Sequence, residues 1–346
     1  MANHHPLYSK FFQTKKTEAE VEEELRTYTT HKELISSLPT NKYGLRLYGS
    51  FWLTEKNIIS ILSAQKHLKA SPDDVFLSTY LKSGTTWIRA LAFAVVNRRK
   101  FSFEDHPLLT THPQEQDIAI HVEGAFSFPQ VPDIDDAVNI SQRRIYATHT
   151  PYSLLPQSVK KSTRVVYVSR DPKDALVSFW HFTNASRPPN APFTSLEEMF
   201  DRFCEGGYLG TIWDHQMEYK EESMKRPESV LFLEYEEMQE KPEECVRRLA
   251  EFLGQPFTRE EEEEEEAVQK IVSLCSLEFL KELQVSKNGR VYDQWGDYVM
   301  KYSSFYRKGK VGDWKVHMSP AMAEKIDRIT QQKMGQYDLI DRHQIK

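Results

Sequence analysis

The chain has little cysteine and lacks long apolar runs. Its three cysteines, Cys204, Cys245 and Cys275, are odd in number and widely spaced, with no CxxC pair and no cluster with histidine at metal-ligand spacing. Disulfides and structural zinc are therefore not expected. No apolar run reaches the ~18 residues of a membrane span, and residues 1–16 lack the apolar centre of a signal peptide. We expect a reducing, cytoplasmic compartment and no membrane partner.

Excess positive charge and low-complexity composition are also missing. Lys and Arg total 45 against 51 Asp and Glu, which gives a net charge of -6. A broad basic surface for nucleic acid is therefore not expected, and any anion site must be local. With 13 glycines, 17 prolines, 39% hydrophobic and 12% aromatic residues, collagen-like and wholly disordered chains are excluded. The composition is that of a globular protein with a sizeable core.

Short apolar runs alternate with helical patterns along most of the chain. The runs typical of strands are residues 75–80, 145–148, 164–169 and 230–235. This alternation predicts an α/β fold, with a central parallel sheet flanked by helices on both faces. Residues 1–40, rich in Lys, Glu and Thr, are expected to form a charged N-terminal extension, and residues 41–346 a single domain.

Two helices are expected to begin directly after predicted strands. The first must begin near Thr85, because the apolar residues that follow recur at helical spacing. Its core-facing residues are Ile88, Leu91, Ala92 and Val95. The second is capped by Asp171 and has Pro172 at its first position, which leaves Arg170 on the turn before it.

Residues 242–266 contain the signals of a third helix and an acidic run. Pro242 is expected to begin the helix, and Gly254 sits where a helix end favours a left-handed residue. In the acidic run 260–266, Thr258 and Glu261 have capping-box spacing, so we interpret the run as a solvated helix start. A metal-binding or protein-docking patch is the disfavoured alternative, because like charges four residues apart only repel.

The most informative segment is the strand-to-helix turn at residues 80–87, with the sequence YLKSGTTW. Gly84 lets the backbone approach an anion, the helix N-terminus points at it, and Lys82 adds a full charge. The segment is not a Walker A loop, whose lysine follows the second glycine of GxxxxGK[ST]. Taken alone, a glycine-containing surface turn is an equally good interpretation.

Other polar residues point to the same sheet edge. His149, Arg170 and Tyr235 stand at the ends of other predicted strands, where ligands bind in open α/β sheets. Near the C-terminus, residues 305–314 have the sequence FYRKGKVGDW, whose adjacent cations and glycines predict a mobile anion clamp. A solvated basic loop is the alternative for that segment.

Together these motifs resemble the signature set of the cytosolic sulfotransferases, most of all the soluble plant members. The similarity covers about residues 45–335, in the right order. The matching stretches are residues 82–87, Thr148-His149, residues 167–174 with Ser178, and residues 307–309 with 312–314. The resemblance implies a P-loop-like nucleotide-binding fold and 3′-phosphoadenosine 5′-phosphosulfate (PAPS) as co-substrate. Acceptors of the plant members include flavonols, brassinosteroids, hydroxyjasmonates and desulfo-glucosinolates.

The resemblance also assigns roles to matching residues. The 5′-phosphosulfate would be held by Lys82, Ser83, Gly84, Thr85 and Thr86, with Trp87 stacked on the adenine. The 3′-phosphate would be bound by Arg170, Ser178, Arg307, Lys308 and Gly309. The adenine would be bordered by Tyr235 and by the segment that contains Cys275 and Leu277. Such a set agrees with the residues themselves, because a donor with about four negative charges needs several cations and hydrogen-bond donors.

His149 is the candidate general base for the acceptor hydroxyl, since an unperturbed imidazole titrates near ~6.5 and is basic at cellular pH. Lys82 is the second candidate catalytic residue, stabilising charge on the bridging oxygen as the bisphosphate departs. No metal is required. The expected partner is a small, largely apolar hydroxyl acceptor, and the protein is expected to be a monomer or weak homodimer. Aromatics between Phe101 and Phe128, with Tyr152 and Trp180, are candidates for the acceptor pocket, although the core is favoured for each.

Four departures from the family pattern are visible. Leu81 occupies a position that is often Pro, and Ala147 a position where some members carry an active-site Lys. Leu277 replaces a common Phe and would remove one aromatic face from the adenine site. Ser319-Pro320 replaces Thr-Val of the animal dimerisation motif, which argues against that mode of dimerisation. Two other functions stay open: a P-loop phosphotransferase using ATP and magnesium, and a non-catalytic protein that binds 3′-phosphoadenosine 5′-phosphate (PAP).

Overall fold

Strands and helices alternate along the chain, as the apolar pattern predicts. The computed structural model describes residues 16–127, 134, 140–188, 190–263, 266–292 and 299–344. Its strands are β1 (Arg46–Tyr48), β2 (Phe51–Leu53), β3 (Val75–Thr79), β4 (Ile120–His121), β5 (Ile145–Thr148), β6 (Arg164–Ser169), β7 (Val230–Glu234), β8 (Arg290–Tyr292) and β9 (Val299–Lys301).

The α-helices are α1 (Glu18–Ser37), α2 (Glu55–His67), α3 (Thr85–Asn97), α4 (Val122–Ala125), α5 (Gln157–Ser162), α6 (Pro172–Ser186), α7 (Leu196–Cys204), α8 (Ile212–Lys225), α9 (Tyr235–Glu240), α10 (Pro242–Phe252), α11 (Arg259–Glu263), α12 (Ala267–Leu274), α13 (Leu277–Glu282), α14 (Gln284–Asn288) and α15 (Pro320–Gln344). Short 3₁₀ turns are η2 (Pro107–Leu109), η3 (Tyr152–Leu154), η4 (Tyr302–Phe305) and η5 (Asp313–Val316).

The main sheet has five strands in the order β4-β5-β3-β6-β7, and every neighbouring pair is parallel. All residues of β3 are buried, as expected for a strand covered on both faces. The four predicted strands are confirmed, although β3 and β7 each end one residue early, at Thr79 and at Glu234, where Tyr235 begins α9. The two-residue edge strand β4 was not anticipated from the sequence.

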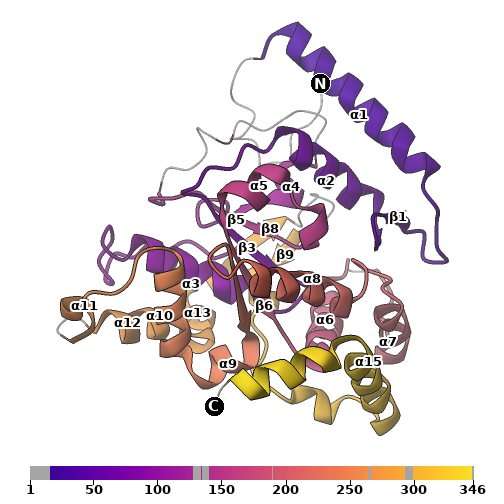
Figure 1. Ribbon diagram of the computed structural model, residues 1–346. Coiled ribbons are helices and arrows are strands. Elements are labelled where there is room, and N and C mark those ends of the chain that lie inside the picture. The colour runs from indigo at the N-terminus through magenta and orange to yellow at the C-terminus, as the bar shows by residue number, and fades with distance from the viewer. Residues whose placement is uncertain are drawn as a thin grey trace.

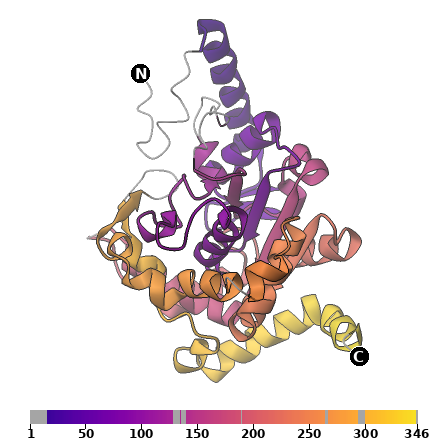
Figure 2. The same cartoon turned by 90° about the vertical axis from the view of Figure 1, so that its left-hand side faces the viewer.

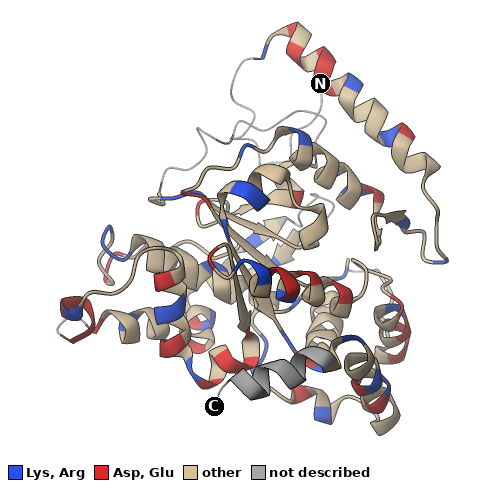
Figure 3. Cartoon of the chain, viewed as in Figure 1, with Lys and Arg blue, Asp and Glu red and all other residues tan. Residues whose placement is uncertain are grey.

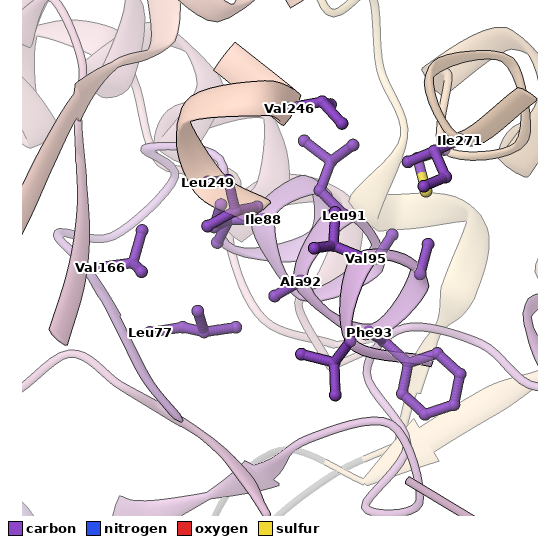
Figure 4. Close-up of a cluster of buried hydrophobic side chains, with 14 of the residues drawn as sticks. Leu77, Ile88, Leu91, Ala92, Phe93, Val95, Val166, Val246, Leu249 and Ile271 are labelled. Carbon is purple, nitrogen blue, oxygen red and sulfur yellow. The ribbon is translucent and has the colours of Figure 1, made fainter. Parts of the chain in front are cut away.

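Successive strand residues pack on opposite faces of this sheet. Leu77 and Val166 face the side covered by α3, α10 and α12, whereas Phe76 and Tyr167 lie in a separate core on the side of α5 and α8. Figure 1 shows these helices on the two sides of the strands. The predicted apolar stripe of α3 is buried against the sheet, with α10 and α12 packed over it (Figure 4). The α/β prediction is therefore confirmed.

Local signals set the helix ends near the sheet. α3 begins at Thr85, and α6 begins at Pro172, where the Asp171 side chain accepts a hydrogen bond from the backbone N–H of Lys173. Gly254, directly after the α10 cap, has a φ of 71°, as expected for a left-handed helix end. The predicted turns are therefore fixed by the expected residues.

The N-terminal helix α1 projects beyond the body of the chain, at the opposite end from α15 (Figure 2). Its first turn carries a complete capping box between Thr17 and Glu20. Figure 3 shows acidic and basic residues interspersed along the ribbon. No helix among the described residues has the length and apolar character to cross a bilayer. Residues 1–15 of the expected N-terminal extension lie outside the described residues, and the division of the chain at residue 40 stays a prediction.

The acidic run corrects one expectation. Thr258 and Glu261 exchange the two hydrogen bonds of the predicted capping box. Glu261 is not solvated, however, because Arg98 and Arg99 at the end of α3 approach its carboxylate to 3.0 and 2.8 Å, and only 7% of the residue is exposed. These ion pairs fasten α11 to α3. Residues 264–265 of the run lie outside the described residues.

Replacing Glu261 by Ala should lower the free energy of unfolding by about 3 kcal/mol, because the buried charge of Arg98 would lose its carboxylate and keep only neutral hydrogen-bond acceptors. The hydrogen bonds from Arg99 and Arg98 lower the pKa of Glu261 to about 2, although burial opposes that effect. This stabilisation is therefore complete above the usual carboxyl pKa and is lost as the pH falls toward 2. Urea unfolding of both proteins at pH 7 and pH 3 measures the difference.

The matched control is Glu263→Ala, on the same helix, which removes only an exposed pair with Arg259. It should cost less than about 0.5 kcal/mol. Equal losses in the two variants would contradict the role given to Glu261.

Candidate active site

A cavity of about 660 Å³ opens at the carboxyl ends of the central strands. The predicted site residues that line it are Lys82, Gly84, Thr85, Thr86, Trp87, His149, Arg170, Ser178, Tyr235, Cys275, Leu277, Arg307 and Gly309. Two predicted residues are not part of this lining: Ser83 is buried inside the turn, and Lys308 is exposed beside Arg307. The structure therefore brings together residues that are more than 200 positions apart, while their individual roles stay predictions.

The turn between β3 and α3 has an unusual backbone. Lys82 and Gly84 have φ values of 62° and 103°, and Lys82 is one of two non-glycine residues with positive φ in the described chain. Arg170 Nη1 donates to the Lys82 carbonyl oxygen at 2.8 Å. A Cβ atom at Gly84 would lie 3.0 Å from the Tyr235 ring. Glycine is therefore required here by both the backbone angle and the close approach.

The ammonium group of Lys82 lies against aromatic rings, 4.0 Å from the centroid of Phe182 and 5.5 Å from that of Phe305. Burial, together with the nearby charges of Arg170 and Arg307, lowers the pKa of Lys82 to about 7. A cation held in this way gains stability from any anion that reaches the cavity.

The other cations at the cavity have partners that hold them in place. The Arg170 guanidinium lies 4.4 Å from the centroid of the Tyr235 ring. Arg307 contacts the Asp313 carboxylate, and Lys308 Nζ lies 2.8 Å from it. Burial opposes the charge on Asp313, but the hydrogen bonds from Lys308 and Arg307 prevail and hold the pKa of that carboxyl well below its usual range.

The C-terminal clamp segment is attached to the start of α6. The Asp174 carboxylate accepts hydrogen bonds from the backbone N–H groups of Gly312 at 2.6 Å and Trp314 at 3.0 Å. These bonds hold the clamp where Arg307 lines the cavity and Lys308 is exposed beside it. The predicted mobility of the clamp stays a prediction.

Buried donors without partners indicate what fits this part of the cavity. Ser83 Oγ, Arg170 Nε and Arg307 Nε are buried and have no hydrogen-bond partner among the described residues. Buried polar groups are normally paired, so these donors match a ligand rich in acceptor oxygens. A nucleotide with several phosphate oxygens meets that requirement.

A flat, less polar wall adjoins these donors. Trp87 and Tyr235 meet edge to face with their ring centroids 5.6 Å apart. At Gly309, with a φ of 62°, a Cβ atom would lie 2.7 Å from Leu277 Cδ1, so the clamp packs directly on the start of α13. Cys275 is fully buried beside them. The arrangement fits a purine base between Trp87 and the segment with Leu277.

The candidate base His149 follows β5, with its ring in the cavity. Its Nδ1 lies 2.8 Å from the backbone carbonyl oxygen of Thr79. A carbonyl only accepts, so Nδ1 carries the proton and Nε2 keeps a free lone pair. Burial lowers the pKa of His149, although Glu123 and the Thr79 carbonyl oppose that effect. The imidazole is therefore neutral and can accept a proton at neutral pH.

Glu123, at the start of the short helix α4, is a residue that the sequence analysis missed. Its Oε1 accepts hydrogen bonds from the backbone N–H of His149 at 2.6 Å and from the hydroxyls of Thr148 and Thr150 at 2.6 and 3.0 Å. Only 2% of the residue is exposed. The available signal was a single carboxylate inside the apolar run 118–126, where a charge must have partners.

The aromatic candidates for the acceptor pocket lie mostly in the core, as the sequence analysis favoured. Phe126 and Tyr152 are buried in the core, and Phe101 packs against it. Trp180 packs with the helices around α6. Phe128 lies outside the described residues. Besides Trp87 and Tyr235, the Phe and Tyr residues that line the cavity are Phe179, Phe182, Tyr208, Phe305 and Tyr306.

Replacing Gly84 by Ala should destabilise the protein by about 2 kcal/mol, because the new Cβ combines a strained φ with the contact to Tyr235. Gly44→Ala is the matched control: Gly44 also has positive φ, but nothing lies within 4 Å of a Cβ there. Urea unfolding of both variants should show the larger loss for Gly84→Ala. A loss at Gly44 as large as that at Gly84 would show that crowding at Tyr235 contributes nothing.

Comparison with known proteins agrees with the geometry of the cavity. The sulfotransferase domain family matches residues 72–338. Among curated relatives, cytosolic sulfotransferase 17 of Arabidopsis thaliana is 40% identical over 311 residues, covering 88% of each chain. Cytosolic sulfotransferase 16 of the same plant is 36% identical over 96% of this chain and 99% of its own. The names of these relatives agree with the expected compartment.

Solved structures show the same fold. An Arabidopsis thaliana sulphotransferase, 32% identical, matches with a TM-score of 0.66 over 92% of this chain and 96% of its own. A mouse sulfotransferase in complex with PAP, 24% identical, matches with a TM-score of 0.63 over 84% of this chain and 94% of its own. The expected family is thus confirmed by both sequence and structure, and the chain belongs to the sulfotransferases.

Proposed function

We propose that the protein transfers the sulfonate group of PAPS to a hydroxyl group of a small organic acceptor in the cytosol, with His149 as the general base. The observation that carries this proposal is that one cavity joins the Lys82 turn and the cations Arg170 and Arg307 to the neutral imidazole of His149. Anion binding and proton acceptance are both needed for such a transfer.

Charge supports PAPS as the donor. The chain carries a net charge of -6, yet Lys82, Arg170 and Arg307 gather at one end of the cavity, with Lys308 exposed beside Arg307. That end also holds the unpartnered donors of Ser83 and both arginines. Two structural relatives were solved with PAP, the bisphosphate that remains after sulfonate transfer. We assign the 5′ group to the Lys82 turn and the 3′-phosphate to Arg170 and Arg307.

The proposed mechanism follows from the positions of the two catalytic candidates. When bound, the donor supplies an activated sulfonate whose bridging oxygen leaves with the bisphosphate. His149 Nε2 takes the proton of the acceptor hydroxyl as its oxygen approaches sulfur. Lys82, in its ammonium form, stabilises the negative charge that develops on the bridging oxygen. The Thr79 carbonyl and Glu123 hold His149 in the required tautomer and position.

The remaining lining describes the acceptor. Phe179, Phe182, Tyr208 and Phe305 supply flat apolar surface, which suits a small organic molecule with a ring system. No residue of this set carries a charge that would demand an ionised acceptor. A monomer or a weak homodimer stays our prediction for the oligomeric state.

Titration calorimetry with PAP in metal-free buffer tests the donor site. The wild-type protein should bind PAP and discriminate against ATP with magnesium. Arg307→Ala should weaken binding of PAP at least about tenfold more than binding of AMP, because AMP lacks the 3′-phosphate that a charge-assisted contact would hold. Equal losses for both nucleotides would refute the role of Arg307. A preference for ATP with magnesium would favour the phosphotransferase alternative.

His149→Ala should reduce sulfonation of an acceptor such as 2-naphthol at least about a hundredfold, the contribution typical of a general base. The affinity for PAP should remain within about threefold, since His149 contacts no proposed phosphate ligand. Initial rates with PAPS and calorimetry with PAP give the two readouts. Retained turnover would remove the base assignment, and absence of turnover in the wild type with any hydroxyl acceptor would favour a non-catalytic PAP-binding protein.

A further inference from the structure

The acceptor end of the cavity contains two polar side chains that the proposed mechanism does not use. Gln116 and His121 both line the cavity, on the segment that leads into and forms the edge strand β4. They stand close to the candidate base, because His121 pairs in register with Ala147, two residues before His149. The ring centroids of His121 and His149 are 5.6 Å apart.

Gln116 supplies an unpaired donor. The residue is 5% exposed, and its Nε2 has no hydrogen-bond partner in the described part of the chain. Its Oε1 accepts from the backbone N–H of His121 at 3.4 Å. That bond orients the amide and leaves the NH₂ group as the free end. A buried donor of this kind calls for an acceptor atom on a ligand.

His121 supplies an acceptor. Its Nδ1 lies 3.3 Å from Oε2 of Glu123, and although the two atoms form no hydrogen bond, neither has another partner among the described residues. The negative charge at that oxygen favours the tautomer with its proton on Nδ1, so Nε2 keeps its lone pair. Burial lowers the pKa of His121 to about 4, although Glu123 opposes it, and the ring is neutral at pH 7. It therefore offers no positive charge to a carboxylate.

We propose that Gln116 and His121 form a subsite for a second hydroxyl group of the acceptor, next to the hydroxyl that faces His149. This inference rests on the function proposed above and narrows it to acceptors with two neighbouring hydroxyls. A hydroxyl fits both residues at once: its oxygen accepts from Gln116 Nε2, and its proton is donated to His121 Nε2. An ether, a carbonyl or an ionised carboxylate lacks the donor that His121 Nε2 requires.

The neighbouring positions of the two imidazoles suit hydroxyls on adjacent carbon atoms. His149 accepts the proton of the reacting hydroxyl, while His121 and Gln116 hold the second one. An acceptor with a single hydroxyl would leave Gln116 Nε2 buried without a partner. Sites that hydrogen-bond a substrate hydroxyl reject analogues without that hydroxyl strongly for this reason. The aromatic residues of the cavity then contact the ring that carries both groups.

The test compares 2,3-dihydroxynaphthalene with 2-naphthol, which differ only in the second hydroxyl. For the wild type with PAPS, kcat/KM for the diol should exceed that for the mono-ol at least about tenfold. Gln116→Leu and His121→Phe keep the approximate side-chain volume. Each should lower the ratio of kcat/KM values toward the ratio of the two compounds' intrinsic reactivities. Comparing ratios between variants cancels the intrinsic reactivity of the diol and its twofold statistical advantage.

Gln269→Leu, at an exposed glutamine of α12, is the matched control and should keep the wild-type ratio. A wild-type ratio near one, or turnover of neither compound while PAP binds normally, would overturn the subsite and leave the donor site intact. A ratio retained in both Gln116→Leu and His121→Phe would also overturn it. Failure of the wild type to bind PAP would instead defeat the proposed function, and this inference with it.

Discussion

The backbone turn between β3 and α3 is the constraint on which the site depends. Two residues with positive φ, Lys82 and Gly84 on either side of Ser83, reverse the chain within a few residues, so that α3 begins directly at the sheet edge. Arg170 fixes the turn by binding the Lys82 carbonyl, and Tyr235 closes on Gly84. The same two side chains border the cavity. The anion site and the framework that shapes it are therefore made of the same residues, so neither can change alone.

Each cation of the site is stabilised by a local partner, and no broad positive surface is needed. Lys82 and Arg170 lie over aromatic rings. Arg307 and Lys308 form ion pairs with the carboxylate of Asp313. A protein of net negative charge can thus keep four positive groups close together without a ligand to neutralise them. Such preorganisation reduces the reorganisation that anion binding would otherwise require.

Much of the fold and the donor half of the site could be predicted from local sequence. The sequence signals for the strands, the caps and the turn at residues 80–87 come from residues that lie near one another in the chain. Glu123, Gln116 and His121 could not be found in this way, because the two-residue strand β4 brings them to His149 only through its pairing with β5. The burial of Glu261 was missed for a similar reason, because its partners Arg98 and Arg99 are far from it in the sequence, at the end of α3.

The lowered pKa of Lys82 links ligand binding to proton uptake. With a pKa of about 7, the Lys82 side chain exchanges its proton near neutral pH as long as no anion lies beside it. A bound phosphate group favours the ammonium form and so draws a proton from the solvent. Affinity for a nucleotide bisphosphate should then decline as the pH rises above this value. An alkaline shift would speed release of the spent nucleotide, and a mildly acidic one would retain it.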